Sequence, residues 1–381
     1  MSVRTVLVQA TAVALSVAAL AAPAVAAAPA GNGSHDATRR AVEAAVADGV
    51  PGVTATAQDG RKVWATTAGV GDLGTGEPRS AADRYRVGSI TKTFVATVLL
   101  QLEAEGRLSL DDTVEKWLPG VVHGHGHDGR RITVRQLLNH TSGIFNYTAD
   151  DDFGRTYFLK DGFDEHRYDT KKPADLVAVA MSHAPDFAPG TSWNYSNTNY
   201  VLAGMVIESV TGRPYATEIR HRIIEPLKLT ATSVPGTRVT VPRPSSRAYS
   251  KLAQTATGPT YDVTRLNPSI AFSAGEMISD SADLNRFYRA LLRGNLLPPK
   301  QLKEMKTTVK AEALRNVDYG LGLMDRELSC GVHVWGHDGG IHGSVSSAVT
   351  TADGRHSLAV NFNGDWSGEG EAVIEAEFCG E

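Results

Sequence analysis

Strand-forming segments lie towards both ends of this 381-residue chain, and helix-forming segments fill the middle. Residues 52–71 (GVTATAQDGRKVWATTAGVG) contain two β-rich runs joined by Asp59-Gly60, a dipeptide typical of a hairpin turn. Near the C-terminus, strands are predicted at 318–328, 333–340 and 344–362, followed by a helix around 369–379. Because strands need neighbours, this distribution predicts an α/β protein of the α+β type, with one antiparallel sheet assembled from both chain ends and flanked by helices.

The middle of the chain, about 110–292, is predicted as a mostly helical subdomain within a single domain of residues 29–381. Asp280 or Ser281 would cap the last of its helices. Residues 239–258, rich in Pro, Ser and Thr, are predicted as a surface loop. The clearest helical patterns lie within 131–143, 172–184, 197–212 and 281–295.

The first 28 residues have the composition of a secretory signal peptide. Arg4 precedes an apolar run over 6–22, and small residues at 24–28 offer cleavage sites. The alternative is an N-terminal membrane anchor, but the run is short and no stop-transfer charges follow it. We therefore expect a secreted protein, extracellular or in the cell envelope, without stable membrane insertion after signal removal.

Charge and cysteine content narrow the possible partners. The formal net charge is −4, and runs of Lys or Arg are absent from the sequence, so we expect no nucleic-acid partner. The two cysteines, Cys330 and Cys379, are most simply a disulfide in an exported protein. A two-cysteine metal site is the alternative, and no C-x-x-C spacing favours it. The disulfide would contribute about 4 kcal/mol in the chain-entropy model.

A lysine occupies an unfavourable place in the helix predicted from Ile90. Ser89 stands where an N-cap is expected, and Lys92 lies three residues later, near the positive end of the helix dipole. Residues three apart share a helix face, so the Lys92 amine can reach the Ser89 hydroxyl. A desolvated lysine can deprotonate a serine, which makes Ser89 a candidate nucleophile and Lys92 its base.

Two further segments are candidates for the same site. Tyr195 and Asn197, in YSN before a predicted helix, could transfer a proton and bind a substrate amide; the alternative is a loop tyrosine followed by a helix cap. His337-Asp338-Gly339-Gly340 follows a strand, and its glycines would let a substrate approach and expose N–H groups to an oxyanion.

The sequence lacks the motifs of two other kinds of hydrolase. Neither G-x-S-x-G nor H-E-x-x-H occurs. His123, His125 and His127 could ligate a metal, but no carboxylate or cysteine supports them, and a solvated loop is the favoured interpretation. We therefore predict no metal and no cofactor.

The order S-x-x-K, Y-x-N and H-x-G resembles the penicillin-recognising serine enzymes, that is, class C β-lactamases and low-molecular-weight D-alanyl-D-alanine carboxypeptidases, particularly the exported Streptomyces carboxypeptidase/transpeptidases. The segments RYRVGSITKTF, ITVRQLLNHTSGI, PGTSWNYSNTNYVLAGMVIESVTG, DYGLGL and LSCGVHVWGHDGG carry the resemblance over nearly all of the mature chain.

The resemblance implies a role for each of these residues. Ser89 would be acylated, Lys92 and Tyr195 would transfer protons, and His337 would replace the lysine of most β-lactamases. Asn197 would bind the substrate amide. The remaining implied substrate contacts are Arg326 to a terminal carboxylate, Phe153 at the cleft mouth, and the strand residues Asp338, Gly339 and Gly340, with the N–H groups of Ser89 and Gly340 as oxyanion donors.

Three positions depart from the family pattern. Asp338 and Gly340 replace hydroxyl residues that help hold a substrate carboxylate, and Ile270 replaces a cleft tryptophan. An aspartate at position 338 would repel a carboxylate.

We expect a serine D-alanyl-D-alanine carboxypeptidase that acts on peptidoglycan stem peptides through an acyl-enzyme and is acylated by β-lactams. The alternatives are an esterase or weak β-lactamase on the same scaffold, which Asp338 favours and Arg326 opposes, and a non-catalytic penicillin-binding protein.

Overall fold

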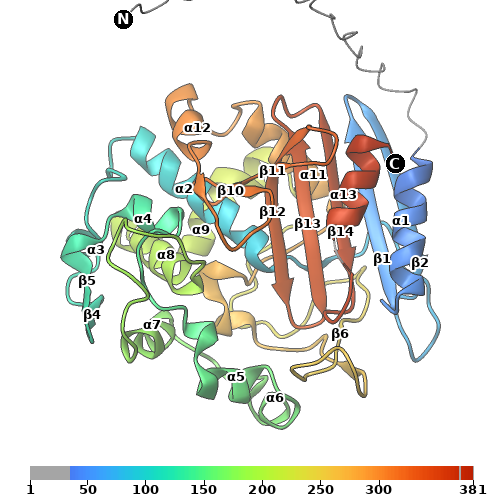
Figure 1. The fold of residues 1–381 in the computed structure, drawn as a ribbon, viewed down its shortest axis with the longest axis horizontal. Helices are drawn as coiled ribbons and strands as arrows, with labels where there is room; N and C mark the ends of the chain where they lie inside the picture. Colours follow the sequence, from blue (N-terminus) through green and yellow to red (C-terminus); the bar gives the residue numbers. More distant parts are fainter. Residues whose placement is uncertain (1–34, 369, 381) are drawn as a thin grey trace, which may run out of the picture. The chain divides into compact units, whose positions relative to one another are not determined.

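An eight-stranded antiparallel sheet forms the centre of the computed structural model, in the order β2-β1-β14-β13-β12-β11-β10-β9 (Figure 1). The two N-terminal strands join six C-terminal ones, which confirms a sheet built from both ends of the chain. The strands are β1 (Gly52–Asp59), β2 (Lys62–Gly69), β9 (Val309–Lys310), β10 (Val317–Tyr319), β11 (Met324–Glu327), β12 (His333–Ile341), β13 (Ser344–Thr351) and β14 (His356–Phe362).

The structure describes residues 35–368 and 370–380. The predicted signal peptide, residues 1–28, lies outside the described residues. From His35 onward the chain forms one compact unit. Within this described part, no helix combines the length and apolar character needed to cross a membrane.

The predicted hairpin is present, and it pairs with the end of the chain. Asp59 lies opposite Lys62 across the turn, while Val53 lies opposite Phe362 of β14. Helices pack on both faces of β1, so most of its side chains are buried, whereas those of the edge strand β2 alternate in exposure. The alternating pattern is that of a strand with one face in water.

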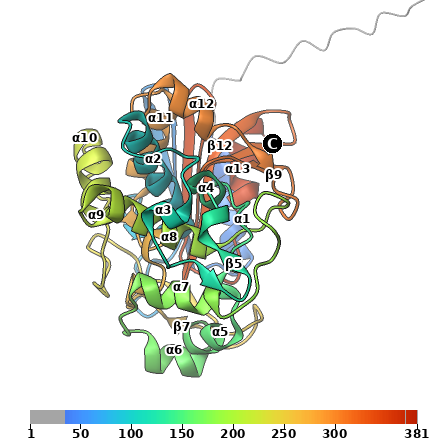
Figure 2. The ribbon, with the colours of Figure 1, turned by 90° about the vertical axis from the view of Figure 1, so that its left-hand side faces the viewer.

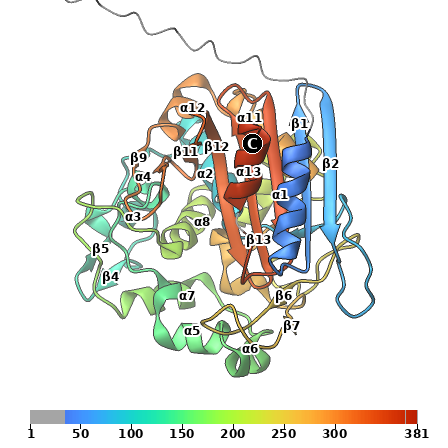
Figure 3. The same ribbon diagram turned by 45° about the vertical axis from the view of Figure 1, so that its right-hand side comes forward.

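Helices cover both faces of the sheet. Figure 3 shows α1 (Asp36–Ala47) and α13 (Gly370–Cys379) side by side on one face, where Val42 and Ile374 pack with Val53 of the sheet. On the other face lies α11 (Ser281–Leu292), which packs on β13 and β14. The Asp280 side chain accepts a hydrogen bond from the Asp283 N–H at 2.8 Å and caps α11, as one of the two predicted caps.

The middle of the chain supplies most of the helices, as predicted, and Figure 2 shows α5, α6 and α7 in its lower part. Around the buried pair α2 (Thr91–Ala104) and α8 (Asn197–Thr211) lie shorter helices. These are α3 (Val114–Trp117), α4 (Val134–Leu138), α5 (Asp151–Tyr157), α6 (Lys160–His166), α7 (Pro173–Met181), α9 (Tyr215–Ile219), α10 (Glu225–Leu227) and α12 (Pro299–Met305).

The segment 239–258 is not only the surface loop that its composition suggested. Tyr249 and Ser250 form the buried strand β6 (Tyr249–Ser250), which pairs with β7 (Tyr261–Asp262), and Leu252 is also buried. The proline and serine content correctly predicts that the rest of the segment lacks regular structure. It does not predict that these side chains are buried.

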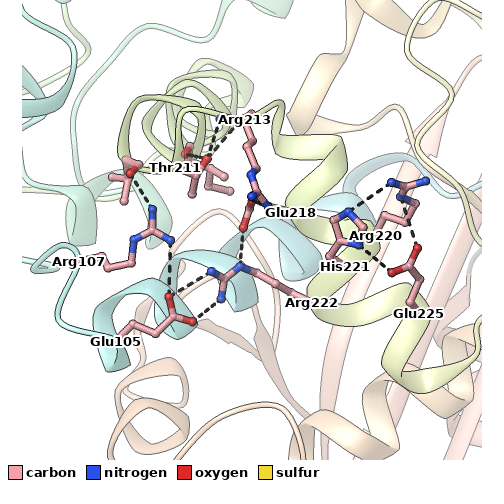
Figure 4. Close-up of polar contacts among 11 residues, drawn as sticks. Glu105, Arg107, Thr211, Arg213, Glu218, Arg220, His221, Arg222 and Glu225 are labelled. Atoms are coloured by element: carbon pink, nitrogen blue, oxygen red, sulfur yellow. Dashed lines mark hydrogen bonds and ion pairs between the residues drawn. The ribbon is translucent and has the colours of Figure 1, made fainter.

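A network of charged side chains anchors the C-terminal end of α2 (Figure 4). Glu105, which directly follows the helix, accepts hydrogen bonds from Arg222, and Arg222 also binds Glu218 at 2.6 Å. Arg222 belongs to a π-helical turn, Arg220–Ile224, that continues α9. Ion pairs of this partly exposed kind each contribute about 0–1 kcal/mol, so the network orients α2 more than it stabilises the fold.

The predicted disulfide is confirmed: Cys330 and Cys379 are bonded, with their Cα atoms 5.8 Å apart. It ties the end of α13 to the turn between β11 and β12. Reduction should therefore release the helix that covers one face of the sheet.

We predict that reducing this disulfide lowers the free energy of unfolding by about 4 kcal/mol, the chain-entropy value for a loop of this length. Denaturant unfolding with and without dithiothreitol measures the change. A variant with both Cys330→Ser and Cys379→Ser should match the reduced wild type and should not respond to dithiothreitol. Equal stability of oxidised and reduced wild type would contradict the prediction.

Candidate active site

Ser89 lies in a 3-10 turn, Gly88–Ile90, that leads directly into α2. The prediction that Ser89 caps the helix is wrong: α2 begins at Thr91, its N-cap is Ile90, and no side chain caps it. Gly88 adopts φ +54, a left-handed conformation that favours glycine, and this turn brings Ser89 to the helix entrance. The hydroxyl is therefore free to interact with other groups.

Lys92 is the buried partner of Ser89. Its Nζ lies 2.9 Å from Ser89 Oγ, 2.8 Å from Asn197 Oδ1 and 2.7 Å from the Ala274 carbonyl oxygen. The side chain is fully buried, and burial lowers the pKa of its amine well below the ordinary value. The unfavourable charge position noted in the sequence thus belongs to an amine whose burial favours the neutral form.

A neutral amine has two N–H groups and one lone pair, and the three neighbours of Lys92 Nζ match that inventory. The Ala274 carbonyl can only accept. Asn197 donates its Nδ2–H to Thr148 Oγ1, so its Oδ1 faces Lys92 as an acceptor. In the neutral amine these two acceptors would take both N–H groups, and the lone pair would be left for the Ser89 hydroxyl proton.

Tyr195 completes the group around Ser89. Its hydroxyl is in hydrogen-bonding contact with the Ser89 side chain, and Lys92 Nζ lies 4.9 Å from the centre of its ring. Burial raises the pKa of the Tyr195 hydroxyl above its ordinary value, so the tyrosine is protonated at neutral pH. The three residues predicted for proton transfer are thus brought together.

The third motif lies on β12, which packs against the Ser89 turn. A Cβ on Gly339 would lie 1.9 Å from the Val87 carbonyl oxygen and 3.0 Å from Ser89 N, so the close approach requires glycine. A Cβ on Gly340 would meet nothing within 4 Å, and Gly340 lines the same cavity as Ser89. The two glycines therefore differ in what they allow. Gly339 lets the backbone of the Ser89 turn approach β12, whereas Gly340 has open space where a side chain would stand.

His337 is fully buried, and within the described part of the chain it forms no hydrogen bond with Ser89. Its Nε2 lies 2.8 Å from the Tyr319 hydroxyl, and burial together with the nearby Lys92 lowers the pKa of His337 to about 4. At neutral pH it is uncharged, unlike the lysine it was expected to replace.

Arg326 and Asp338 form an ion pair with each other. Arg326 Nη2 donates to Asp338 Oδ2 at 2.5 Å across the neighbouring strands β11 and β12. The second oxygen, Asp338 Oδ1, is buried and has no hydrogen-bond partner. The cation expected to bind a substrate carboxylate is therefore already engaged.

A cavity of about 570 Å³ opens beside Ser89. Phe153 of α5 lies in its wall, as expected for an aromatic residue at the cleft, and Ile270 also lines it. The wall is largely apolar, but Asn197, Lys251 and Asp365 add polar groups. The other apolar side chains in it include Tyr147, Phe158, Leu252, Ile341 and Trp366.

The histidine-rich loop is partly different from the prediction. His123 lies in the two-residue strand β4 (His123–Gly124) and is exposed, whereas His127, in β5 (His127–Asp128), is buried. His125 binds the Met181 carbonyl oxygen. Over residues 35–368 and 370–380, no three His, Cys, Asp or Glu side chains are grouped so that they could hold a metal ion.

Sequence reasoning missed several residues around the site. His140 lies beneath Tyr195, with ring centres 4.3 Å apart, and its Nε2 is 3.2 Å from the Tyr319 hydroxyl. His140 is in the LLNHTSG segment that carried the family resemblance, which was the available signal. Ala274 offered none, because it acts through its backbone oxygen.

Comparison with known proteins agrees with this geometry. The family model described as Beta-lactamase matches residues 38–376. The chain belongs to the β-lactamase family. A D-stereospecific amidohydrolase from a Streptomyces species has a similar structure, with 66% sequence identity, a TM-score of 0.87, and coverage of 92% of this chain and 100% of that one.

More distant members of the family have varied activities. The D-amino acid amidase of Ochrobactrum anthropi SV3, solved with D-phenylalanine, is 28% identical, with a TM-score of 0.78 and coverage of 91% of this chain and 99% of that one. The esterase EstB of Burkholderia gladioli is 33% identical over 183 residues, 47% of this chain and 45% of that protein. Penicillin-binding protein 4 of Amycolatopsis lactamdurans is 28% identical over 236 residues, 61% of this chain and 56% of that protein.

The chain thus spans about half the length of these two curated relatives. The predicted family and fold are confirmed, and the protein is a member of a family that includes serine hydrolases and penicillin-binding proteins.

We predict that Gly339→Ala displaces the Ser89 turn, because its Cβ would overlap Val87. It should lower the free energy of unfolding by about 1–3 kcal/mol, the cost of overpacking, and should abolish most hydrolysis. Gly340→Ala is the matched control, with a stability change within about 0.5 kcal/mol. Chemical denaturation of both variants measures the contrast, and equal losses would show that the approach of the turn to β12 is not the constraint.

Proposed function

We propose that this protein is a D-stereospecific amide and ester hydrolase that works through an acyl-enzyme on Ser89. The observation that carries the proposal is the buried Lys92 amine, whose Nζ lies 2.9 Å from Ser89 Oγ. The similarity to a D-stereospecific amidohydrolase over nearly the whole chain supports the stereochemical part.

The reaction follows from the positions of the protons. The Ser89 oxygen attacks the substrate carbonyl carbon while its proton passes to Lys92 Nζ. The N–H groups of Ser89 and Gly340 stabilise the resulting oxyanion. Tyr195 and Lys92 then return a proton to the leaving amine or alcohol, and the acyl-enzyme forms as the carbon–nitrogen or carbon–oxygen bond breaks. Water, deprotonated by the same pair, releases the acid and restores Ser89.

The cavity favours a substrate with an apolar acyl side chain. Phe153, Phe158 and Ile270 enclose it on one side, and burial of a benzyl-sized group against such walls contributes about 1.5–3 kcal/mol. Ile270 stands where the family has a tryptophan, which leaves more room for the acyl group. An aromatic D-amino acid amide is therefore the substrate class that we propose.

The Arg326–Asp338 pair disfavours a free carboxylate on the leaving group. Asp338 neutralises Arg326, and the negative charge of its carboxylate, whose second oxygen is buried without a partner, would repel an anion. A D-alanyl-D-alanine carboxypeptidase stays as the second candidate function, because Arg326 lies on the strand next to the third motif.

The mature enzyme is proposed to act outside the cytoplasm, on the basis of the N-terminal sequence. Purification of the protein from culture medium, followed by N-terminal sequencing, tests this: a chain that begins near residue 29 is expected, and an uncleaved cell-bound chain contradicts it.

We predict that D-phenylalanine amide is hydrolysed and that the L-enantiomer is hydrolysed at least about tenfold more slowly, since 1.4 kcal/mol of differential binding gives that factor. Ser89→Ala should abolish turnover and covalent labelling by a β-lactam, with an unchanged circular dichroism spectrum. Chiral chromatography of the products and intact mass spectrometry measure both effects. Equal rates for the enantiomers, or an adduct on the Ser89→Ala protein, would sink the proposal.

We predict that Asp338→Asn raises kcat/KM for D-alanyl-D-alanine peptides relative to D-phenylalanine amide by about tenfold or more, because it releases Arg326 to bind a carboxylate. Asp325→Asn, which removes a carboxylate bound to His333 on the same strand pair, is the control and should leave the ratio unchanged. Arg326→Ala should cancel the gain. If Arg326→Ala lowers wild-type activity on both substrates equally, Arg326 supports the fold instead.

A further inference from the structure

A chain of hydrogen bonds runs behind the active site through three fully enclosed side chains. His140 Nε2 lies 3.2 Å from the Tyr319 hydroxyl oxygen, and that oxygen lies 2.8 Å from His337 Nε2. At the far end, His337 Nδ1 lies 2.5 Å from the Asp338 carbonyl oxygen. The three side chains come from the segment after α4, from β10 and from β12. None of them lines the cavity beside Ser89.

The direction of this chain is fixed at its start. His140 Nδ1 lies 3.2 Å from the backbone nitrogen of Ser196, which can only donate. It also lies 3.2 Å from Asn199 Nδ2, and Asn199 Oδ1 on the other side accepts from Ser142. Two donors therefore face Nδ1, so in the neutral imidazole the proton must lie on Nε2.

Each later bond follows from that one. The His140 Nε2–H donates to the Tyr319 oxygen, and the single tyrosine proton is then donated to His337 Nε2. His337 must carry its own proton on Nδ1, where the Asp338 carbonyl oxygen accepts it. The Asp338 carbonyl oxygen can only accept a hydrogen bond, so this last contact independently requires the proton on His337 Nδ1.

We propose that His140 and Tyr319 are positioning residues that keep His337 in one neutral tautomer, with its Nε2 lone pair occupied. In this state His337 takes no proton from Ser89 or Lys92, and proton transfer during acylation is confined to Lys92 and Tyr195. His140 also supports the Tyr195 ring, at 4.3 Å between ring centres. This role rests on the Ser89 chemistry proposed above, but the tautomers themselves do not.

The surroundings favour an uncharged chain. Burial and the nearby Lys92 lower the pKa of both imidazoles, to about 4 for His337 and well below the ordinary value for His140. Burial also raises the pKa of Tyr319. The other titratable groups that act on these three residues are Tyr195, Tyr200, Tyr288, Arg326 and Asp338. These shifts favour the uncharged form of all three members.

The direct test is the tautomer of each histidine, read by long-range ¹H–¹⁵N NMR of protein labelled with ¹⁵N-histidine. We expect His140 to give the resonance pattern of an imidazole protonated on Nε2, and His337 to give that of an imidazole protonated on Nδ1. Both patterns should stay unchanged from pH 5.5 to 8. His140→Asn and His337→Gln assign the two signals by removing them. Protonation of both nitrogens of either ring, or a His337 proton on Nε2, would overturn the proposal.

Tyr319→Phe tests the consequence, because it removes the hydroxyl and little volume. The single His337 tautomer should be replaced by a mixture, and kcat for D-phenylalanine amide should fall about tenfold with KM within twofold. Tyr85→Phe is the control. It loses a buried hydrogen bond to Ser281, which is not part of the chain of hydrogen bonds described above, and it should change neither the tautomers nor kcat.

Rescue by a conservative change separates this role from simple packing. His337→Gln keeps an acceptor for Tyr319 and should retain more kcat than His337→Leu. Equal kcat in these two variants, or an unchanged His337 tautomer in Tyr319→Phe, would overturn the positioning role. If the protein hydrolyses no amide at all, the NMR result still decides whether the chain exists, so the two proposals fail separately.

Discussion

The approach of the Ser89 turn to β12 is the contact on which the site depends. Val87 and Ser89 lie against Gly339 so closely that no side chain fits between them. This contact joins the Ser89 turn and the start of α2, which carries Lys92, to the strand that carries His337 and Gly340. The nucleophile, its base and the strand edge therefore belong to one packed unit, although some 250 residues separate them along the chain. A small displacement at Gly339 would move all of them relative to one another.

Burial determines the chemistry around this contact. Lys92, His140 and His337 would each carry or readily accept a proton in water, yet all three are enclosed and their pKa values are lowered. Burial without a carboxylate partner favours the neutral form of an amine, and a neutral amine is a base. The helix-dipole position of Lys92 acts in the same direction. The site thus obtains its base by withholding counter-charges, while Arg326, which is paired with Asp338, lies outside the cavity.

The sequence patterns that rest on local periodicity predicted the structure well. The hairpin at Asp59-Gly60 and the Asp280 cap depend on neighbours in the chain, and both are present; the sheet from both chain ends is also present, although only the positions of its strands, and not their pairing, are local in origin. The N-cap at Ser89 failed because the tight Gly88 turn, imposed by packing on β12, replaces a normal helix start. His127 and Leu252 were expected in water and are buried, since loop composition does not reveal which side chains turn inward.

The fold also sets when the protein can become active. The strand that completes the site, β12, and the two strands that join it to β1 are the last strands of the sheet to be synthesised. Until they are available, the hairpin has no partner on its inner edge and Ser89 has no strand to pack against. Pairing of such distant segments is slow compared with local helix formation. A nascent or truncated chain can therefore hold Lys92 on a formed α2, with Ser89 just before it, and remain inert; hydrolysis begins only when β12, β13 and β14 have joined the sheet.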